Sequence, residues 1–184
     1  MHAGRRLRGR RDARLAIALF SLLLAACAGI GTGGLLPGHS GVDDVIRALG
    51  QPALEWREAD GSRRLAFPRG PMGVHTYMAR VGPDGRLRDI DNVLEPAVFA
   101  RVTAGMSEDD VLRTLGPPVP GWTIYFPARD ERVWEWRYCD EWNQLARFEV
   151  LFDGGRRTVR STMSLREDQI GACGGADGGC WCAH

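Results

Sequence analysis

Lysine is absent from this 184-residue chain, whose 24 basic residues are all arginine. A chain without lysine cannot form a Schiff base with a carbonyl substrate or supply the lysine of a phosphate-binding P-loop. A long hydrophobic run is missing as well. The uncharged stretch 15–26 has twelve residues, whereas a helix that spans a bilayer needs about 20. These absences exclude lysine-dependent chemistry and a membrane-spanning helix at this stretch.

An excess of basic charge is also missing from most of the chain. The formal net charge is +1, and six of the arginines lie in the first 14 residues beside one acidic residue, Asp12. A basic segment followed by an uncharged stretch is typical of a secretory signal peptide, which we predict over residues 1–26. Its removal would leave 18 arginines and 22 acidic residues. Because nucleic-acid binding needs a basic face, we expect no nucleic-acid partner.

The end of this segment resembles the bacterial lipobox. Leu24, Ala25 and Ala26 precede Cys27, and in such signals the cysteine receives diacylglycerol and palmitate and becomes the first residue of the mature chain. The alternative is an ordinary signal peptide with an incidental cysteine. Because Ala28 follows the cysteine where an aspartate would retain the protein at the inner membrane, the resemblance implies lipid anchoring in the outer membrane, facing the periplasm.

The glycine-rich residues 27–39 are predicted to form a flexible tether. Residues 38–41, Gly-His-Ser-Gly, are superficially similar to the nucleophile elbow of serine hydrolases. The elbow requires glycine two positions after the serine, where this chain has Val42. We therefore predict that Ser40 is the N-cap of a helix.

An internal repeat organises the rest of the chain. Residues 43–52 recur as residues 109–118, a shift of 66 positions. The repeat predicts two copies of one supersecondary unit, over 40–94 and 95–168, followed by a Cys/Gly-rich tail over 169–184.

Each copy is predicted to begin with a short capped helix. In the second copy, Ser107 and Asp110 have the spacing of a capping box, and Val111 and Leu115 share one apolar face. Gly116 is predicted to end the helix in the left-handed conformation, and two prolines prevent its continuation. Such a short helix must pack on another element to be stable.

Strand-like segments separated by turn signals follow each helix, and the short connections predict antiparallel sheets. Residues 96–102 are predicted to form an additional helix that pairs with the second capped helix. The fold class is therefore α+β, with each helix or helix pair packed on an antiparallel sheet of three to four strands. The predicted strands are 54–57, 63–67, 76–81 and 86–93 in the first copy and 123–126, 133–138, 146–152 and 158–163 in the second.

Residues 99–118 resemble the signature of the SmpA/OmlA lipoproteins, the BamE-like domain of Gram-negative outer membranes. The shared pattern is an apolar helix, a Gly-Met-Ser turn at 105–107, a second helix, and Leu-Gly-x-Pro at 115–118. Residues 132–138 are similar to the family's aromatic strand. The first copy lacks the Gly-Met pair. The resemblance implies a BamE-like unit, here present as two tandem copies.

The same resemblance implies a function. The best-known member of the family is an accessory lipoprotein of the machinery that inserts β-barrels into the outer membrane, so β-barrel assembly components are the implied partners. We expect a lipid-anchored binding or scaffold protein for outer membrane assembly or envelope integrity. Because beta-lactamase inhibitory proteins carry a similar unit twice, the alternative is an inhibitor of a secreted or periplasmic enzyme.

The remaining polar residues argue against catalysis. The four histidines are His2, His39, His75 and His184, and none stands beside residues that would make it a general base or activate it. Many carboxylates lie at predicted helix starts, where capping explains them. We expect no enzyme activity and no cofactor.

Four cysteines remain beside Cys27, namely Cys139, Cys173, Cys180 and Cys182. An even number in an oxidising compartment predicts disulfides, although the sequence leaves their connectivity open. The alternative is a metal site that includes His184, but paired zinc ligands usually have wider spacing, so no metal site is predicted. The glycine-rich tail after residue 169 is predicted to be mobile unless it is crosslinked.

The aromatic residues fall into two groups. Trp134, Trp136 and Tyr138 alternate and share one strand face, which predicts a core stripe under the helices. Others lie in or beside loops, where partner binding is the functional interpretation. For Trp142 the alternative is a side chain that folds back over the sheet edge. These possible partner-binding residues are Trp142, Trp122 and Tyr125.

Overall fold

The computed structural model describes residues 34–173 and 180–182. The chain divides into Met1–Leu35 and Leu36–His184, and the fold below is that of Leu36–His184. The predicted signal peptide and the lipid attachment site Cys27 lie outside the described residues. Within 34–173 and 180–182, none of the helices combines the length and hydrophobicity that crossing a membrane requires.

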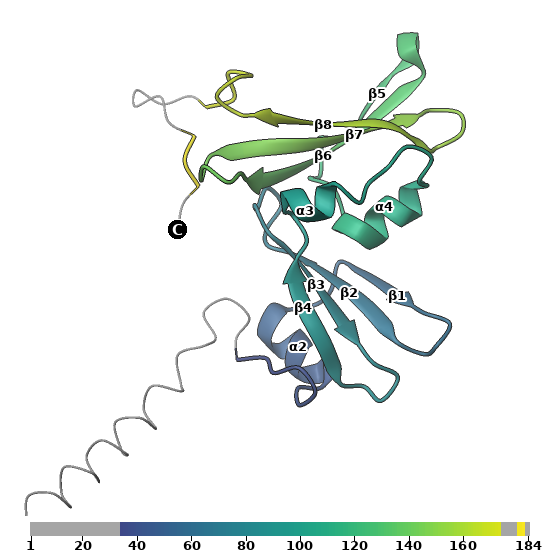
Figure 1. The fold of residues 1–184 in the computed structure, drawn as a ribbon, viewed down its shortest axis with the longest axis vertical. Coiled ribbons are helices and arrows are strands. Elements are labelled where there is room, and N and C mark those ends of the chain that lie inside the picture. The colour runs from purple at the N-terminus through teal and green to yellow at the C-terminus, as the bar shows by residue number, and fades with distance from the viewer. Residues whose placement is uncertain (1–33, 174–179, 183–184) are drawn as a thin grey trace, which may run out of the picture. The chain divides into compact units, whose positions relative to one another are not determined.

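The predicted α+β class with antiparallel sheets is confirmed. The two sheets have four strands each, in the sequential orders β1-β2-β3-β4 and β5-β6-β7-β8 (Figure 1). The first segment contains α2 (Val42–Leu49), β1 (Leu54–Arg57), β2 (Arg63–Pro68), β3 (Thr76–Val81) and β4 (Leu87–Asn92). The second contains α3 (Pro96–Phe99), α4 (Glu108–Leu115), β5 (Ile124–Phe126), the 3-10 turn η2 (Pro127–Arg129), β6 (Glu131–Cys139), β7 (Leu145–Asp153) and β8 (Val159–Arg166).

Helix α3 is shorter than the predicted helix over 96–102. It ends at Phe99, and the next residues form tight turns in which Arg101 N–H bonds to the Val98 carbonyl and Val102 N–H to the Phe99 carbonyl. The chain must reverse direction before α4, so the regular helix stops after one turn. Strand β8 is longer than predicted and continues to Arg166.

The elements form alternating layers. Helix α2 lies on one side of the first sheet, α3 and α4 lie between the two sheets, and the second sheet follows (Figure 1). The first sheet is buried on both faces, because β2 buries the consecutive residues Leu65, Ala66 and Phe67. This differs from the usual antiparallel sheet, in which one face is polar.

Helix α4 contacts both sheets. On the first sheet, Trp56 Nε1–H donates to the Asp109 carboxylate at 3.2 Å, and an Arg64 N–H donates to the Arg113 carbonyl at 2.9 Å. On the second sheet, Trp136 Nε1–H donates to the Gly116 carbonyl at 3.2 Å. The helix is therefore held on two sides by hydrogen bonds as well as by apolar contacts.

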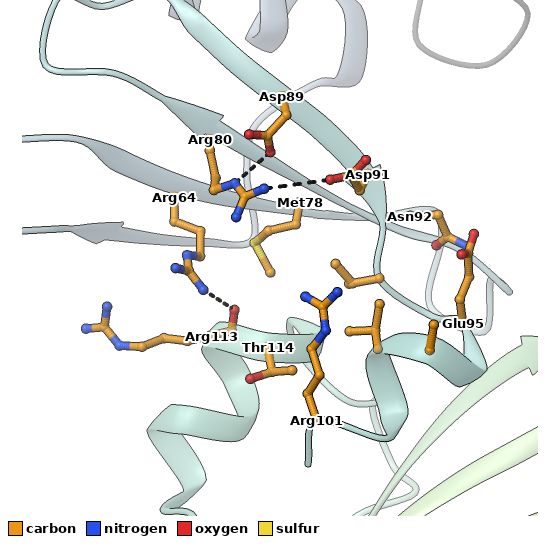
Figure 2. Close-up of a pocket in the computed structure, with 13 residues that line it drawn as sticks. Arg64, Met78, Arg80, Asp89, Asp91, Asn92, Glu95, Arg101, Arg113 and Thr114 are labelled. Carbon is orange, nitrogen blue, oxygen red and sulfur yellow. Dashed lines mark hydrogen bonds and ion pairs between the residues drawn. The ribbon is translucent and has the colours of Figure 1, made fainter.

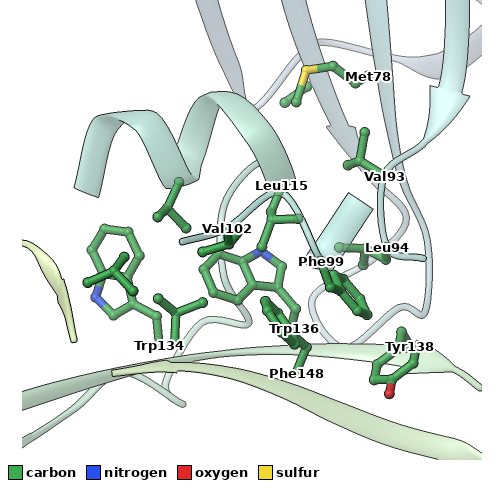
Figure 3. Close-up of a cluster of buried hydrophobic side chains, with 14 of the residues drawn as sticks. Met78, Val93, Leu94, Phe99, Val102, Leu115, Trp134, Trp136, Tyr138 and Phe148 are labelled. Atoms are coloured by element: carbon green, nitrogen blue, oxygen red, sulfur yellow. The ribbon is translucent and has the colours of Figure 1, made fainter. Parts of the chain in front are cut away.

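One hydrophobic core contains residues of both segments (Figure 3). The predicted stripe of Trp134, Trp136 and Tyr138 is buried and belongs to this core. The Phe99 ring from α3 stacks on Phe148 at a centroid distance of 4.1 Å and meets Tyr138 edge-on at 4.7 Å. The same core includes Met78 and Ala66 from the first sheet, so the two segments share one interior.

The sequence repeat coincides with matching backbone contacts. In each segment, the first residue of the last strand donates its N–H to the second residue before the long helix, and a residue after the helix donates to the second strand. In the first segment, Leu87 N–H donates to the Ser40 carbonyl and Ala53 N–H donates to the Ala66 carbonyl. In the second segment, Val159 N–H donates to the Met106 carbonyl and Val119 N–H donates to the Glu135 carbonyl. All four N···O distances are 2.8 Å. Ser40 and Met106, like Ala53 and Val119, are 66 positions apart, as in the sequence repeat.

The helix starts differ between the segments. In α4, Ser107 Oγ accepts the Asp110 N–H at 3.2 Å, and the Asp110 carboxylate accepts the Ser107 N–H at 2.9 Å, so the capping box formed as predicted. Hydrogen bonds from the Ser107 side chain and backbone hold the pKa of Asp110 below its usual range.

In α2, the prediction that Ser40 is the N-cap was wrong. The N-cap is Gly41, whose N–H bonds to the Asp44 carboxylate at 2.9 Å. Ser40 Oγ instead accepts the Leu36 N–H at 2.9 Å. The serine hydroxyl therefore closes the turn that precedes the helix, and a residue without a side chain takes the cap position.

The helix ends also correct the sequence-based expectation. Gly116 has φ 74° and ψ −169°, and Gly50 has φ 87° and ψ −168°. Both have positive φ but extended ψ, a region essentially restricted to glycine, rather than the left-handed helical conformation. The repeat places Leu49 at the position that corresponds to Leu115, which is buried, but Leu49 is only half-buried. The reason is that α2 faces one sheet, whereas α4 lies between two.

The first prediction compares Gly116→Ala with Gly50→Ala. Both substitutions strain a positive-φ position at a cost of about 1–3 kcal/mol. A Cβ at position 116 would also approach Thr76 Cγ2 to 2.8 Å, whereas a Cβ at position 50 meets nothing within 4 Å. We expect Gly116→Ala to lower the free energy of unfolding by about 1–3 kcal/mol more than Gly50→Ala, the range for overpacking. Urea denaturation of both variants measures the difference, and equal losses would contradict the close packing.

Candidate protein-binding surface

The turn between β6 and β7 holds the most exposed tryptophan among the described residues. The Asp140 carboxylate accepts the N–H groups of Trp142 at 2.9 Å and Gln144 at 2.8 Å, and Asn143 N–H bonds to the Asp140 carbonyl at 3.0 Å. Asn143 adopts positive φ, 59°, which asparagine tolerates better than most residues. These bonds fix the backbone of the turn, and the Trp142 side chain is 69% exposed.

The C-terminal tail is tied to this turn. Leu145 N–H bonds to the Cys180 carbonyl at 2.6 Å, and Cys182 N–H bonds to the Asn143 carbonyl at 3.0 Å. Two disulfides join the same region. Cys139 is bonded to Cys182 across a sequence separation of 43, and Cys173 to Cys180 across a separation of 7. The described tail residues therefore extend the edge of the turn as a short paired segment.

The tail contributes a second exposed tryptophan. Trp181 forms an antiparallel bridge with Gln144 and is 61% exposed, while Cys180 and Cys182 on either side are buried. Trp181 was not among the predicted partner-binding residues. The available signal was the Cys-Trp-Cys alternation, because successive side chains of an extended segment point to opposite sides. Two buried disulfide cysteines place the intervening ring outside.

A depression of about 480 Å³ lies beside Trp142. Tyr138 and Leu165 contribute apolar surface to its lining, and Glu141 and Arg166 contribute charged groups. An aromatic side chain at the rim of a mixed polar and apolar depression is typical of protein-interface anchors. We call the two exposed tryptophans and this depression the tryptophan surface.

A buried ionic cluster lies next to the Cys173–Cys180 disulfide. The Glu167 carboxylate, almost fully buried, accepts two hydrogen bonds from Arg137 at 2.8 and 2.7 Å and one from Arg147 at 3.3 Å. Arg147 also pairs with Glu135 at 3.1 Å, and its guanidinium lies 3.8 Å from the centroid of the Trp122 ring. Paired and hydrogen-bonded charges of this kind fix a single arrangement of the chain.

The other predicted partner-binding residues do not join this surface. Trp122 is half-buried and stacks on Arg147 within the molecule. Tyr125 is exposed, and its hydroxyl donates a hydrogen bond to the Asp130 carboxylate at 2.7 Å. In the strand register it lies opposite Arg132, near the start of β6, whereas Trp142 follows the end of that strand. The structure therefore separates Trp142 from both.

One group of described residues has the composition of a metal site. Glu167, Cys173 and Cys180 have ligand atoms that all lie within 4.8 Å of one another. The two cysteines are bonded to each other, and the carboxylate is neutralised by arginines. Cysteine binds a metal as the thiolate, and neither cysteine is a thiolate while the two are joined in a disulfide. In this form the group therefore offers no set of metal ligands.

A charged depression of about 400 Å³ lies between the first sheet and the helices (Figure 2). Arg80 pairs with Asp89 at 2.6 Å and lies 3.9 Å from Asp91. Arg64 donates to the Arg113 carbonyl, as described above. Because most of these cations already face acids or carbonyls, the depression is a polar joint between α4 and the first sheet rather than an anion site.

The two described histidines do not form a catalytic arrangement. The His75 ring stacks on Tyr77 at a centroid distance of 6.1 Å, and His39 is exposed. Within residues 34–173 and 180–182, neither imidazole makes a hydrogen bond with another residue. Acid–base chemistry therefore has no geometric support at either ring.

No protein-family model, curated protein or solved structure matches this chain. The resemblance to BamE-like lipoproteins stays a prediction.

The second prediction concerns the disulfides. Chain-entropy arithmetic for a separation of 43 residues gives about 4 kcal/mol of stabilisation, so the Cys139→Ser/Cys182→Ser variant should lose stability of that order in urea denaturation. The shorter Cys173–Cys180 loop should contribute less. Thiol titration of protein from an oxidising compartment should find four thiols at these positions only after reduction, and four free thiols beforehand would contradict the pairing.

The third prediction is that Trp142→Ala separates binding from stability. Because the ring is exposed, we expect the free energy of unfolding to change by less than about 1 kcal/mol, while affinity for a partner falls by about 2 kcal/mol, the threshold for an interface hot spot. The control is Trp136→Ala, which removes a buried ring and should cost about 3–5 kcal/mol of stability. A loss of stability at position 142 comparable to that of the control would mean that Trp142 is a structural lid.

Proposed function

We propose that the two segments are tandem copies of a BamE-like unit, and that the protein is a lipid-anchored binding or scaffold lipoprotein of the outer membrane. In this proposal the folded unit faces the periplasm and is accessory to β-barrel assembly or envelope integrity. The tandem arrangement is supported by the matching backbone hydrogen bonds 66 residues apart. The lipid anchor is supported by the lipobox-like residues that end at Cys27.

The observation that carries the binding function is the tryptophan surface. Trp142 and Trp181 are held on backbone segments that hydrogen bonds and the Cys139–Cys182 disulfide fix in place. A large ring on a rigid backbone loses little conformational freedom on binding, so more of its contact energy appears as affinity. Exposed tryptophan is also unfavourable in water, so its retention on a rigid turn favours a binding role.

The use of the buried carboxylates favours binding over catalysis. Glu108 pairs with Arg132 at 3.1 Å and with Arg157, and Glu135 and Glu167 are paired with arginines as described above. A catalytic acid or base needs a proton that can leave or arrive at a substrate. Carboxylates held by guanidinium groups are committed to structure instead.

The fourth prediction is the direct test of this function. A photo-crosslinking amino acid at position 142 of the full-length protein, irradiated in native membranes, should capture outer membrane lipoproteins or β-barrel assembly components. The same amino acid at position 57, where Arg57 is exposed on the first sheet, is the matched control and should capture fewer of these proteins.

Mass spectrometry of the extracted protein should find a mature N-terminus at a lipidated Cys27.

Two outcomes would contradict the proposal. Capture of one soluble enzyme from position 142 would favour an inhibitor instead. A mature N-terminus that is not a lipidated Cys27 would remove the membrane anchor.

A further inference from the structure

The face of the second sheet that points away from α4 has unusual chemistry, and we call it the outer face. Its strand register brings Ile124, Val133 and Leu151 side by side across β5, β6 and β7. Together with Phe126 and Met163 they line an open groove of about 400 Å³. Ile124 is 44% exposed, and Phe126 and Met163 are also exposed, whereas Val133 at the centre of the row is buried. Exposed apolar side chains gathered on one face indicate an interaction site more strongly than scattered ones.

Acidic residues flank the apolar row. Along β6 the outward residues are Glu131, Val133 and Glu135, and along β7 they are Asp153, Leu151 and Glu149. Outward residues of a strand are about 7 Å apart. The two neighbouring strands thus present the same acid–apolar–acid pattern in register. A partner that covers the apolar row must bring its own polar groups next to these carboxylates.

Three of the four carboxylates already have arginine partners. Glu131 pairs with Arg129 at 3.0 Å, Asp153 with Arg160 at 3.0 Å, and Glu135 with Arg147 at 3.1 Å.

The fourth carboxylate, Glu149, makes no hydrogen bond or ion pair with the described residues. Burial, and then the neighbouring Glu135 carboxylate, raise the pKa of Glu149. The Arg147 charge offsets this rise only in part, and it forms no ion pair with Glu149. A partly buried carboxylate without an ion-pair partner among the described residues is the group whose charge a basic partner would complement.

The layer order shows what kind of element fits. The corresponding face of the first sheet is covered by α4, as the contacts of Trp56 and Arg64 show. There the Arg113 guanidinium lies 3.2 Å from the Glu58 carboxylate and 5.6 Å from the centre of the Trp56 ring. The outer face of the second sheet is the last layer of the described stack (Figure 1). The molecule itself therefore shows an amphipathic helix with a basic side chain on the equivalent face.

We propose that the outer face of the second sheet docks an amphipathic helix of another protein. Apolar side chains of that helix cover Ile124, Leu151 and Met163, and an arginine or lysine on the same helix pairs with Glu149. Residues three or four apart on a helix are about 6 Å from each other, which matches the spacing between the apolar row and the acidic row. The inference takes from the proposed function only that the protein binds other proteins, and it concerns a different surface from the tryptophan surface.

The test uses the membrane-extracted full-length protein and two labelled helical peptides. Both peptides have leucines at helical spacing, and they differ in one residue, arginine in the first and glutamine in the second. Fluorescence anisotropy should show at least tenfold tighter binding of the arginine peptide. With Glu149→Gln this preference should vanish, whereas Glu95→Gln, the same change at the exposed N-cap residue of α3, should leave it intact.

A second pair of variants tests the apolar row. Ile124→Ser should weaken binding of both peptides about tenfold, whereas Ile170→Ser, at a residue that is 43% exposed and outside the groove, should have no effect. Urea denaturation of all four variants should give similar stabilities, which separates loss of docking from loss of folding.

Three outcomes would overturn the inference. Equal binding of the two peptides would remove the role of the cation, and unchanged binding by Ile124→Ser would remove the apolar contact. Self-association of the protein that Glu149→Gln abolishes would assign the outer face to a second copy of this chain. Each is independent of crosslinking from position 142, so failure here leaves the test of the proposed function intact.

Discussion

Helix α4 lies between two sheets, and its end at Gly116 is the contact on which the rest of the fold depends. The helix stops in a backbone conformation open to glycine, the carbonyl of Gly116 accepts a hydrogen bond from Trp136, and its Cα faces Thr76 and Ala66 of the first sheet. A side chain at this point would separate the layers. Because α4 is only eight residues long, it depends on both sheets for its own stability, and the sheets depend on it for a common core.

This arrangement decides where polar groups can lie. The first sheet is covered on both sides by helices, and its interior-facing arginine, Arg64, donates one N–H to the Arg113 carbonyl of α4. The second sheet has one covered face, rich in aromatic rings, and one outer face, where arginines neutralise most of the carboxylates. Glu149 forms no ion pair with the described residues, and it lies beside the partly exposed apolar residues of the groove. The layer order thus produces a surface with unbalanced charge and uncovered hydrophobic side chains.

The tail adds a different kind of constraint. A glycine-rich segment has too little apolar surface to offset its ordering entropy. The Cys139–Cys182 disulfide and two backbone hydrogen bonds fix the described residues Cys180 to Cys182 against the β6–β7 turn. The result is a rigid edge that carries Trp142 and Trp181. Next to the Cys173–Cys180 disulfide, Glu167 and its two arginines form a buried ionic cluster. Covalent and ionic contacts therefore do at this edge what hydrophobic burial does at α4.

The sequence by itself determined the local structure. The 66-residue repeat, the Ser107 capping box, the strand alternation of Trp134, Trp136 and Tyr138, and the turn signals predicted the class, the sheets and most element positions, because these depend on neighbours a few residues away. Only the tertiary structure decided that α4 contacts both sheets, that Trp122 stacks on Arg147, that Cys139 pairs with Cys182, and that Glu149 forms no ion pair with the described residues. Each of these depends on residues distant in the chain, and the spacing of residues in a sequence does not specify which faces meet.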